Sequence, residues 1–437
     1  MSESIDDRRR ETPLRRVGLA VLLVSCLSCS AGDEPAANGP AHAAQPADDR
    51  ELNASEVDLL RSLGYVDVVE EADDDTSARG GVTLRDASRM QPGLTYFTNV
   101  NDCSSHLVEE DGTEVRSWRH SPCDVWGNSI LLPNGDVLAV HHDPHPEGSQ
   151  TEEAGARRLL KLNWEGELQW TRKLPTHHDV DVMPSGNIAT LTYQHRRIPE
   201  IHATDRVRDH YLAELNPEGE LLEETSITDL MLASPDVVKI LPVKVRDRDG
   251  SREIDLVHTN SLEFLREPEL AAQNPLYAPS NVLICVRHQN LVMIVDWNTK
   301  KVIWAWGQNE ISGPHDATLL ENGNVLLFDN GLSRKWSRIL EVNPRTDEIV
   351  WEYKAKNPRE FFTVTRGATQ RVENGNTLIT YSRKGSIFEV TPEGDTVWEY
   401  VNERKADGKP RSRIVRARRL TPLRDPRTDE PRFPVSD

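Results

Sequence analysis

Three segments of the chain each place a histidine at the same point of a repeated pattern. Their sequences are THHDVDVMPSGN (176–187), LVHTNSLEFL (256–265) and GPHDATLLENGNVLLFDNG (313–331). In two of them a His-Asp pair precedes a Ser/Asn-Gly-Asn turn at the same spacing. Repeats arranged about an axis aim equivalent side chains at a common centre. Imidazoles gathered there can serve as nucleophile, general acid or hydrogen-bond donor near neutral pH.

An arginine and an asparagine accompany these histidines. A guanidinium donates two parallel hydrogen bonds to an oxyanion such as sulfate or phosphate, and an amide adds a neutral donor. Three histidines would also suit zinc, but Arg and Asn in the same cluster place positive charge and donors where a cation would lie. We therefore predict an anion site without metal or cofactor. Its expected residues are His178, His258, Asn260, Arg287 and His315, with His177 and His288 as further substrate contacts.

Another interpretation stays open at this point. The His-Asp pairs could merely hydrogen-bond the inner strand of each repeat, which would explain the repetition but neither Arg287 nor Asn260. Asp179 and Asp316 are the only carboxylates that we associate with the histidine motif. Because each directly follows a histidine, we expect it to point to the opposite face of its strand.

The repeat also predicts the fold. Apolar runs flank four turns of the Asn/Ser-Gly-Asp/Asn type, at 134–136, 185–187, 322–324 and 374–376. This pattern is typical of two-residue hairpin turns in which both central residues have positive φ. Each unit continues through a further turn to a Trp-bearing strand such as DEIVWEY (347–353), whose tryptophan we expect to pack between repeats. Four antiparallel strands in about fifty residues form a propeller blade.

Helical periodicity is nearly absent between residues 90 and 400, so we predict an all-β protein, a six-bladed β-propeller of four-stranded antiparallel blades. Loops at 194–208 and 246–255 are expected to interrupt the third and fourth blades. The blades should begin near Pro92, Cys123, Asp179, His258, Asp316 and Gly367.

The N-terminal residues predict export. Residues 1–25 have a basic start and an apolar run at 17–24 that is too short to cross a bilayer as a helix. The sequence Leu23-Val24-Ser25-Cys26 matches a lipobox, in which Cys26 would carry the lipid. An ordinary secretory signal, or a twin-arginine signal using Arg15 and Arg16, is the alternative. We predict a lipoprotein of the bacterial cell envelope, periplasmic or anchored to the outer membrane.

The remaining regions follow from composition. Residues 26–80 are rich in Ala, Pro and Asp and are expected to form a flexible tether, in which 52–66 could make one short helix. The propeller should span 81–425, and 426–437 form a C-terminal tail. A net charge of −19 with 71 acidic residues argues against nucleic acid as a partner. We expect the basic run at 411–419 to form a last strand with its arginines in solvent.

The five cysteines fit an exported protein. Cys103 and Cys123 both fall in the first blade and could form a disulfide, which would contribute ~3 kcal/mol through loop closure. Cys285 lies in the apolar strand NVLICV and should be buried. The sequence contains no adjacent Cys pair and no CxxC outside the signal region, so a thiolate metal site or a redox dithiol is disfavoured.

The chain resembles the bacterial arylsulfotransferases, the aryl-sulfate sulfotransferases of the cell envelope. The similarity runs over about 81–420 and is most specific at HTNS (258–261), RHQ (287–289) and PHDA…FDNG (314–331). The resemblance implies a six-bladed propeller whose central site moves a sulfuryl group from a phenolic sulfate to a phenol without a nucleotide sulfate donor. Separately, the lipobox ending at Cys26 predicts a membrane contact through the lipid anchor.

The same resemblance implies roles for the site residues. His315 would become transiently sulfated, while His258, Asn260 and Arg287 would hold the sulfuryl oxygens. A histidine of the His177-His178 pair would complete the site, and His178 is favoured because its His-Asp context mirrors that of His315. Neutral His315 would attack sulfur in line with the phenolate, and a phenol would then reverse the step.

Two other classes of function remain as alternatives. One is a non-enzymatic propeller that binds a ligand or a protein at the envelope. The other is a quinoprotein oxidoreductase, suggested by the strands KKVIWAW (300–306) and DEIVWEY. The lack of an adjacent Cys pair and of a convincing set of calcium ligands counts against the quinoprotein.

Overall fold

A computed structural model describes residues 80–100, 102–144, 156–248, 251–404 and 411–420, with the short paired strands β28 (Leu423–Arg424) and β29 (Pro431–Arg432). The signal segment with Cys26, the expected helix at 52–66 and nearly all of the tether lie outside the described residues. None of the helices in the described ranges has the length and apolar character that crossing a membrane requires.

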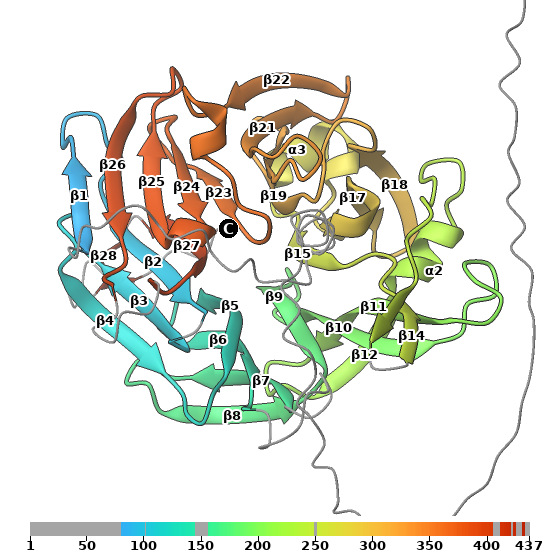
Figure 1. Cartoon of the computed structure of the whole chain (residues 1–437). Coiled ribbons are helices and arrows are strands. Elements are labelled where there is room, and N and C mark those ends of the chain that lie inside the picture. Colours follow the sequence, from blue (N-terminus) through green and yellow to red (C-terminus); the bar gives the residue numbers. More distant parts are fainter. Residues whose placement is uncertain are drawn as a thin grey trace, which may run out of the picture. The chain divides into compact units, whose positions relative to one another are not determined.

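Six antiparallel sheets surround a common centre in the order in which they follow along the chain (Figure 1). Blade 1 contains, from the centre outward, β27 (Ile414–Leu420), β2 (Leu94–Asn99), β3 (Ser104–Val108) and β4 (Glu114–Arg119). Blade 2 contains β5 (Val125–Leu131), β6 (Val137–His142), β7 (Arg157–Leu162) and β8 (Leu168–Lys173). Blade 3 contains β9 (Thr176–Val182), β10 (Ile188–Arg196), β11 (Arg206–Leu215) and β12 (Leu221–Ser226).

The other three blades repeat this order. Blade 4 contains β15 (Thr259–Phe264), β16 (Asn281–Val286), β17 (Leu291–Asp296) and β18 (Lys301–Trp306). Blade 5 contains β19 (His315–Leu319), β20 (Val325–Asp329), β21 (Arg338–Asn343) and β22 (Glu348–Tyr353). Blade 6 contains β23 (Ala368–Arg371), β24 (Thr377–Tyr381), β25 (Ser386–Val390) and β26 (Thr396–Val401). The all-β, six-bladed prediction is therefore confirmed.

Short helices occupy some of the connections. They are α2 (Ile227–Leu232), α3 (Pro268–Gln273) and the 3-10 turns η1 (Pro275–Tyr277), η2 (Arg287–Gln289), η3 (Pro358–Glu360) and η4 (Ser382–Lys384). The loop expected in blade 3 at 194–208 is shorter, because β10 and β11 extend into it and leave 197–205 without strand. The segment 246–255, expected to interrupt blade 4, instead contains β13 (Arg246–Arg248) and β14 (Ser251–Ile254), which extend the sheet of blade 3.

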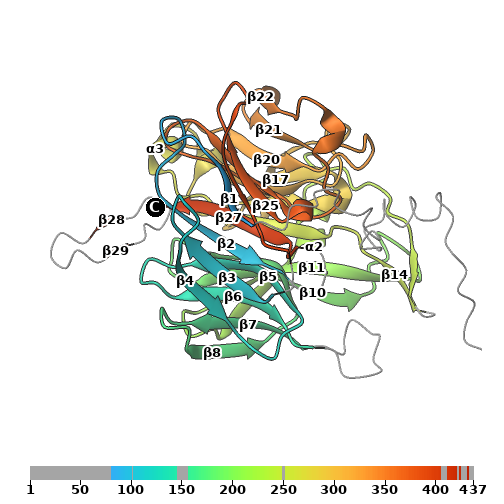
Figure 2. The ribbon, with the colours of Figure 1, turned by 60° about the vertical axis from the view of Figure 1, so that its left-hand side comes forward.

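The two ends of the described chain close the ring. The first strand, β1 (Gly81–Arg85), pairs with β26 as a fifth, outermost strand of blade 6. The late strand β27 pairs with β2 and is the innermost strand of blade 1, which Figure 2 shows next to β2 and β3. The prediction that its arginines face solvent is wrong. The side chains of Arg416 and Arg419 are 15% and 1% exposed, because a strand at the centre of the ring contacts carboxylates of other blades.

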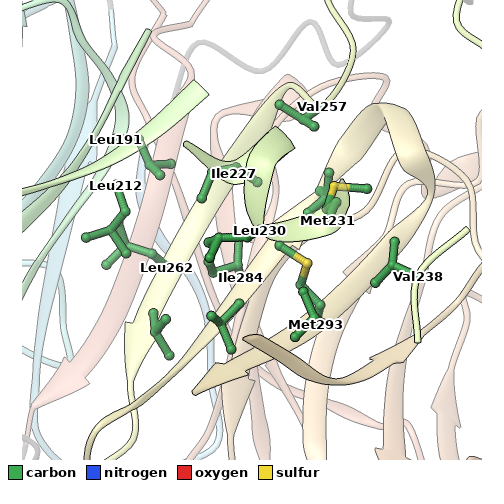
Figure 3. Packing of buried hydrophobic residues seen from close by; sticks show 14 of the residues in the cluster. Leu191, Leu212, Ile227, Leu230, Met231, Val238, Val257, Leu262, Ile284 and Met293 are labelled. Carbon is green, nitrogen blue, oxygen red and sulfur yellow. The ribbon is translucent and has the colours of Figure 1, made fainter. Parts of the chain in front are cut away.

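The hydrophobic core consists of interfaces between successive blades. Each main apolar cluster of the described residues joins two neighbouring blades, which explains why central strands such as β16 are buried on both faces while β22 is exposed on its outer side. The largest cluster joins blades 3 and 4, where α2 adds Ile227, Leu230 and Met231 (Figure 3). Tryptophans such as Trp118 and Trp398 are fully buried in these interfaces.

The inner hairpins differ in detail from the expected turns. In the first, Leu132 N donates to Asp136 O and Gly135 N donates to Leu132 O, and only Gly135 has positive φ. The same holds at Gly186, Gly323 and Gly375. These are longer loops with a single left-handed glycine, so the two-residue prediction is wrong, although each hairpin lies where it was expected.

The cysteine arrangement fits the blades. A disulfide joins Cys103 and Cys123, with 6.3 Å between the Cα atoms. It connects blade 1 to the segment that enters blade 2. Cys285 is a buried free thiol in β16.

Candidate functional site

A cavity of about 200 Å³ lies at the centre of the ring, where all six blades contribute to its wall. The predicted residues that line it are His177, His178, His258, Asn260 and His315. Arg287 and His288 are not among the lining residues. Residues that the sequence did not single out also line it, including Trp126, Asn128, His142, Arg157, Arg208, Arg366 and Arg416.

Bulges in the inner strands turn these side chains toward the centre. In β9, His177 pairs with Leu191 and Val180 with Thr190, so that His178 and Asp179 bulge out of the ladder. Register shifts occur at the corresponding points of β5, β15, β19 and β27. The backbone φ is positive at His178 (61°), His258 (45°) and Asp316 (50°), a conformation that is uncommon for residues other than glycine. The repetition seen in the sequence is therefore a repeated bulge as well as a repeated residue type.

His178 and His258 form a contact pair. Their Nε2 atoms are 3.3 Å apart, so one of them must donate a proton to the other. On its other side, His258 Nδ1 lies 2.7 Å from Asp255 Oδ2. Since a carboxylate oxygen accepts, Nδ1 carries the proton and His258 Nε2 is the atom that faces His178.

Asp255 is a carboxylate of the candidate site that the sequence analysis did not identify. It is fully buried, and although burial opposes ionisation, the neighbouring His258 and His288 hold the pKa of this carboxyl well below its usual range. The prediction that Asp179 and Asp316 are the only associated carboxylates is thus wrong. The signal was present as the Asp-x-x-His spacing in front of HTNS, which a turn brings together here.

His288 connects Asp255 to Arg287. His288 Nδ1 lies 2.7 Å from the backbone oxygen of Asp255, and Arg287 Nη1 lies 2.8 Å from His288 Nε2. This order fixes His288 as a neutral imidazole that donates from Nδ1 and accepts at Nε2. Both Arg287 and His288 therefore lie behind the cavity wall, where His288 orients Arg287.

His315 is held from both sides. Its Nδ1 lies 2.7 Å from Asn330 Oδ1 and 3.0 Å from Gly313 O, both of which are acceptors. The amide nitrogen of Asn330 donates to Thr363 O and Arg366 O, which fixes the orientation of that amide. His315 Nδ1 therefore carries the proton, and Nε2 accepts from the backbone N–H of Arg366 at 3.1 Å.

The electrostatics keep the imidazoles neutral. Burial, with the nearby charge of Arg287, lowers the pKa of His315 to about 3. Burial and the neighbouring His177 and His210 hold the pKa of His178 well below its ordinary value. At neutral pH both imidazoles therefore keep a lone pair for chemistry.

Asn260 and His177 complete the predicted set. Asn260 Nδ2 donates to Pro314 O at 2.8 Å, which ties the bulge of β15 to the residue before His315. His177 is 2% exposed, with Nε2 at 3.2 Å from Thr192 O and its ring against His210. Of the two adjacent histidines, His178 is the one in polar contact with His258.

Asp255, His258 and His288 lie close enough together to be considered as metal ligands. Their nitrogens, however, already face hydrogen-bond partners, and the cationic Arg287 contacts the outer nitrogen of His288. A second cation between them would meet this positive charge. The donor set therefore does not fit a metal.

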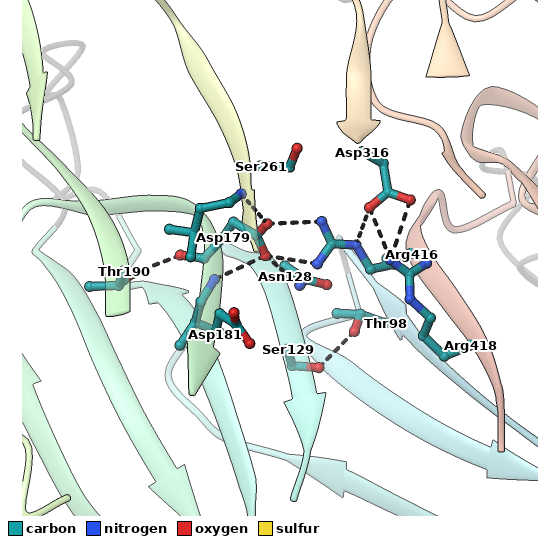
Figure 4. A network of polar contacts seen from close by, with 12 residues as sticks. Thr98, Asn128, Ser129, Asp179, Asp181, Thr190, Ser261, Asp316, Arg416 and Arg418 are labelled. Carbon is teal, nitrogen blue, oxygen red and sulfur yellow. Dashed lines mark hydrogen bonds and ion pairs between the residues drawn. The ribbon is translucent and has the colours of Figure 1, made fainter. Parts of the chain in front are cut away.

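A charged network lies beside the imidazoles. Arg416 donates both Nη atoms to Asp179, at 2.8 and 2.9 Å, and its Nε lies 2.7 Å from Asp316 (Figure 4). Arg418 also contacts Asp316, at 3.1 Å. Burial opposes ionisation, but Arg416 and Arg418 hold the pKa of Asp316 below its usual range. Asp316 lines the same cavity as His315, whereas Asp179 is not among the lining residues, and both aspartates bind Arg416 of β27 across the centre of the ring.

A known protein family matches most of the propeller. A model of the arylsulfotransferase (ASST) family matches residues 127–403, which hold His178, His258, Arg287 and His315. None of the curated proteins compared with this chain matches it.

Similar solved structures share little sequence with the chain. A protein of unknown function from Bacteroides caccae is 12% identical over 75% of this chain and 98% of its own, with a TM-score of 0.47. A streptogramin B lyase is 14% identical over 78% and 93%, with a TM-score of 0.43. A periplasmic gluconolactonase of Pseudomonas aeruginosa is 10% identical over 74% and 99%, with a TM-score of 0.42. Likenesses this distant say nothing about activity. The family match spans more than half of the sequence, and the chain belongs to the arylsulfotransferase family.

Proposed function

We propose that this protein transfers a sulfuryl group from a phenolic sulfate to a phenol through a covalent intermediate on His315. Membership of the family supports sulfotransferase activity. The observation that carries the mechanism is the fixed state of His315. Its Nδ1 proton is held by Asn330 and Gly313, which leaves the Nε2 lone pair as the nucleophile at the cavity.

In the first step Nε2 forms a bond to sulfur while the bond from sulfur to the phenolic oxygen breaks. The phenolate leaves with the electron pair of that bond. In the resting site Nε2 accepts from the Arg366 N–H, so the substrate must take the place of this hydrogen bond. Once released, the amide can donate to a sulfuryl oxygen, which is where negative charge collects during transfer.

The pair formed by His178 and His258 is suited to handle the proton. The free site keeps both imidazoles neutral, but the negative charge of a bound ester favours the uptake of one proton from solvent by the pair. The leaving phenolate takes this proton, and the accepting phenol returns one to the pair in the second step, so that the proton balance closes over the cycle. When the pair holds the extra proton, the buried carboxylate of Asp255 at 2.7 Å stabilises the imidazolium. Asp255 is thus a positioning residue, which acts through His258.

Arg287 supplies positive charge close to His315. It is 3% exposed and adds to the lowering of the His315 pKa, so its field reaches the reacting nitrogen. The same field would stabilise the sulfuryl oxygens in the transition state. A sulfate monoester carries one fewer negative charge than a phosphate monoester, so one guanidinium with neutral donors is sufficient.

The covalent step can be tested by mixing the protein with 4-nitrophenyl sulfate in the absence of acceptor. We expect a burst of about one phenolate per active site and a mass gain of one sulfuryl group on the peptide that contains His315. The added mass should disappear when phenol is supplied. His315→Ala should give neither the burst nor the mass gain.

His178→Ala serves as the matched variant, since it should slow the burst while the label still maps to His315. A full burst in His315→Ala, or a label on His178 or His258, would contradict the assignment of the nucleophile. A protein that binds the ester without releasing phenolate would instead support a non-enzymatic binding propeller.

We also propose that the protein is lipid-anchored in the cell envelope, on the basis of the lipobox that ends at Cys26. Expressed in a bacterium, the full chain should sediment with membranes, and Cys26→Ala should move it to the soluble fraction. If both proteins fractionate alike, Cys26 is not the anchor.

A further inference from the structure

Two arginines line the cavity on the side of blades 2 and 3. Arg157 belongs to β7 and Arg208 to β11, and both guanidinium groups lie over the ring of Tyr193, at 5.1 and 4.0 Å from its centroid. Arg208 is only 6% exposed. His142 of blade 2 also lines the cavity, with Nε2 at 3.4 Å from Arg157 Nη1. We call these three residues the distal subsite.

The distal subsite contains two guanidinium groups. The pKa of the neighbouring His177 is held well below its ordinary value by burial, by His210 and by the charges of Arg208 and Arg157, so this imidazole is neutral. Among the described residues that line the cavity, the one carboxylate is Asp316, which binds Arg416 and Arg418. A guanidinium carries five N–H donors, so it can contact its neighbours and a ligand anion together.

The direction of the reaction connects this subsite to the substrate. In-line displacement places the phenolic oxygen on the side of sulfur that faces away from His315. His315 belongs to blade 5, and in a ring of six blades blade 2 lies opposite (Figure 1). The aromatic ring of a bound ester therefore extends across the centre toward Trp126 and the distal subsite.

We propose that Arg157 and Arg208 bind a carboxylate carried by the aromatic ring of the substrate, at the end away from the reacting oxygen. The preferred acceptors are then phenols with an acidic side chain, and the donors are their sulfate esters. The position assigned to the reacting end of the substrate rests on the proposed function. The charge, the burial and the stacking of the two arginines are observed independently of the proposed function.

The test compares acceptors in pairs that differ only in charge. With 4-nitrophenyl sulfate as donor, kcat/KM would be measured for 4-hydroxybenzoate and 4-hydroxyphenylacetate and for the corresponding neutral amides. One charge-assisted hydrogen bond favours the acid by roughly 10- to 100-fold. Arg157→Gln and Arg208→Gln should remove this preference, so that kcat/KM for acid and amide differs by less than about threefold.

Arg158→Gln is the matched control. Arg158 is adjacent to Arg157 in β7, but it binds Asp143 at 2.8 Å and does not line the cavity. This variant loses the same charge and should keep the preference. Because Arg208 is buried and its replacement could unfold blade 3, the less buried Arg157 decides the outcome if Arg208→Gln fails to fold.

Calorimetric binding of 4-hydroxyphenylacetate to His315→Ala separates this proposal from the proposed function, because it needs no turnover. Binding that weakens at least tenfold in the double variant with Arg157→Gln supports the distal subsite even if transfer fails. Equal kcat/KM for acid and amide in the wild type, or a preference that survives in Arg157→Gln, would overturn it.

Discussion

Neighbouring residues in the sequence belong to two very different polar groups at the centre of this propeller. His178 and His315 face the cavity as neutral imidazoles, while Asp179 and Asp316 bind Arg416 as ions. The bulges in β9 and β19, with positive φ at His178 and Asp316, separate each histidine from its aspartate.

The difference between these groups lies in how buried polarity is compensated. In the Arg416 network two carboxylates meet two guanidinium groups, so that each charge has an ionic partner. Among the imidazoles, burial removes the charge instead and lowers the pKa values. The first solution stabilises a fixed structure across the ring. The second leaves a lone pair on His315 that a substrate can reach.

The largest effect should come from breaking the charged group. Arg416→Met leaves Asp179 and Asp316 buried without their shared partner, and we expect a loss of about 3–5 kcal/mol in the free energy of unfolding. His315→Ala, in the other group, should cost roughly 1–2 kcal/mol. Urea unfolding of both variants measures the contrast. Similar losses in the two would mean that the ion pairs do not hold β27 in the ring.

The next effect concerns the carboxylate behind the imidazoles. Asp255→Asn should lower kcat/KM by roughly 10²- to 10⁴-fold for donors with a poor leaving group, because His258 loses the partner that stabilises its protonated form. Donors such as 4-nitrophenyl sulfate, whose phenolate needs no proton, should lose far less. A plot of log kcat/KM against the pKa of the leaving phenol should therefore have a steeper slope for Asp255→Asn than for the wild type.

Asp181→Asn is the control for loss of a partly buried carboxylate, since Asp181 binds Arg266 outside the cavity. It should leave that slope unchanged. If Asp255→Asn slowed all donors equally, Asp255 would be a structural residue rather than one that acts through His258.

Sequence periodicity was sufficient to predict the blades, but it did not predict which residues contact those of the site. Glycine turns and Trp-bearing strands recur locally, so hairpins such as β19–β20 could be placed from the sequence alone. The partners of β27 could not, because its arginines meet Asp179 and Asp316 only after the ring closes, across 237 and 102 residues of sequence. A basic run is more often solvated than central, and that general tendency misled the prediction.

Within the site, the sequence predicted which residues line the cavity better than it predicted the role of each residue. His178, His258, Asn260 and His315 line one cavity as the repeat and the resemblance suggested. Arg287 and His288 lie behind the wall, and the Asp255 carboxylate went unnoticed because a turn, not strand periodicity, brings it to His258. The sequence spacing of the residues does not by itself show which side chains hydrogen-bond to one another.

A smaller effect is expected from a variant that keeps the charge of Arg287 but changes its hydrogen-bond geometry. Arg287→Lys keeps the positive charge but cannot reproduce the fork that contacts His288, so we expect kcat to fall about 10²-fold with little change in stability. Steady-state kinetics with 4-nitrophenyl sulfate and phenol provide the measurement. Turnover close to that of the wild type would show that only the field of Arg287 matters.

The smallest effect is an absence of pH dependence in the first step. With a pKa of about 3, His315 should lose only about 10% of its neutral form at pH 4, whereas an exposed histidine would lose more than about 99%. Below about pH 6.5 the unfolded chain binds more protons than the fold, in which His178 and His315 are held neutral, so stability falls with pH and the burst is expressed per folded protein, measured by circular dichroism at each pH. Rapid-quench measurement of the phenolate burst between pH 7 and pH 4 should therefore give a nearly constant rate. A tenfold fall per pH unit below pH 6 would instead mean that the nucleophile is solvated, and that the contrast between neutral and charged groups at the centre of the ring does not hold.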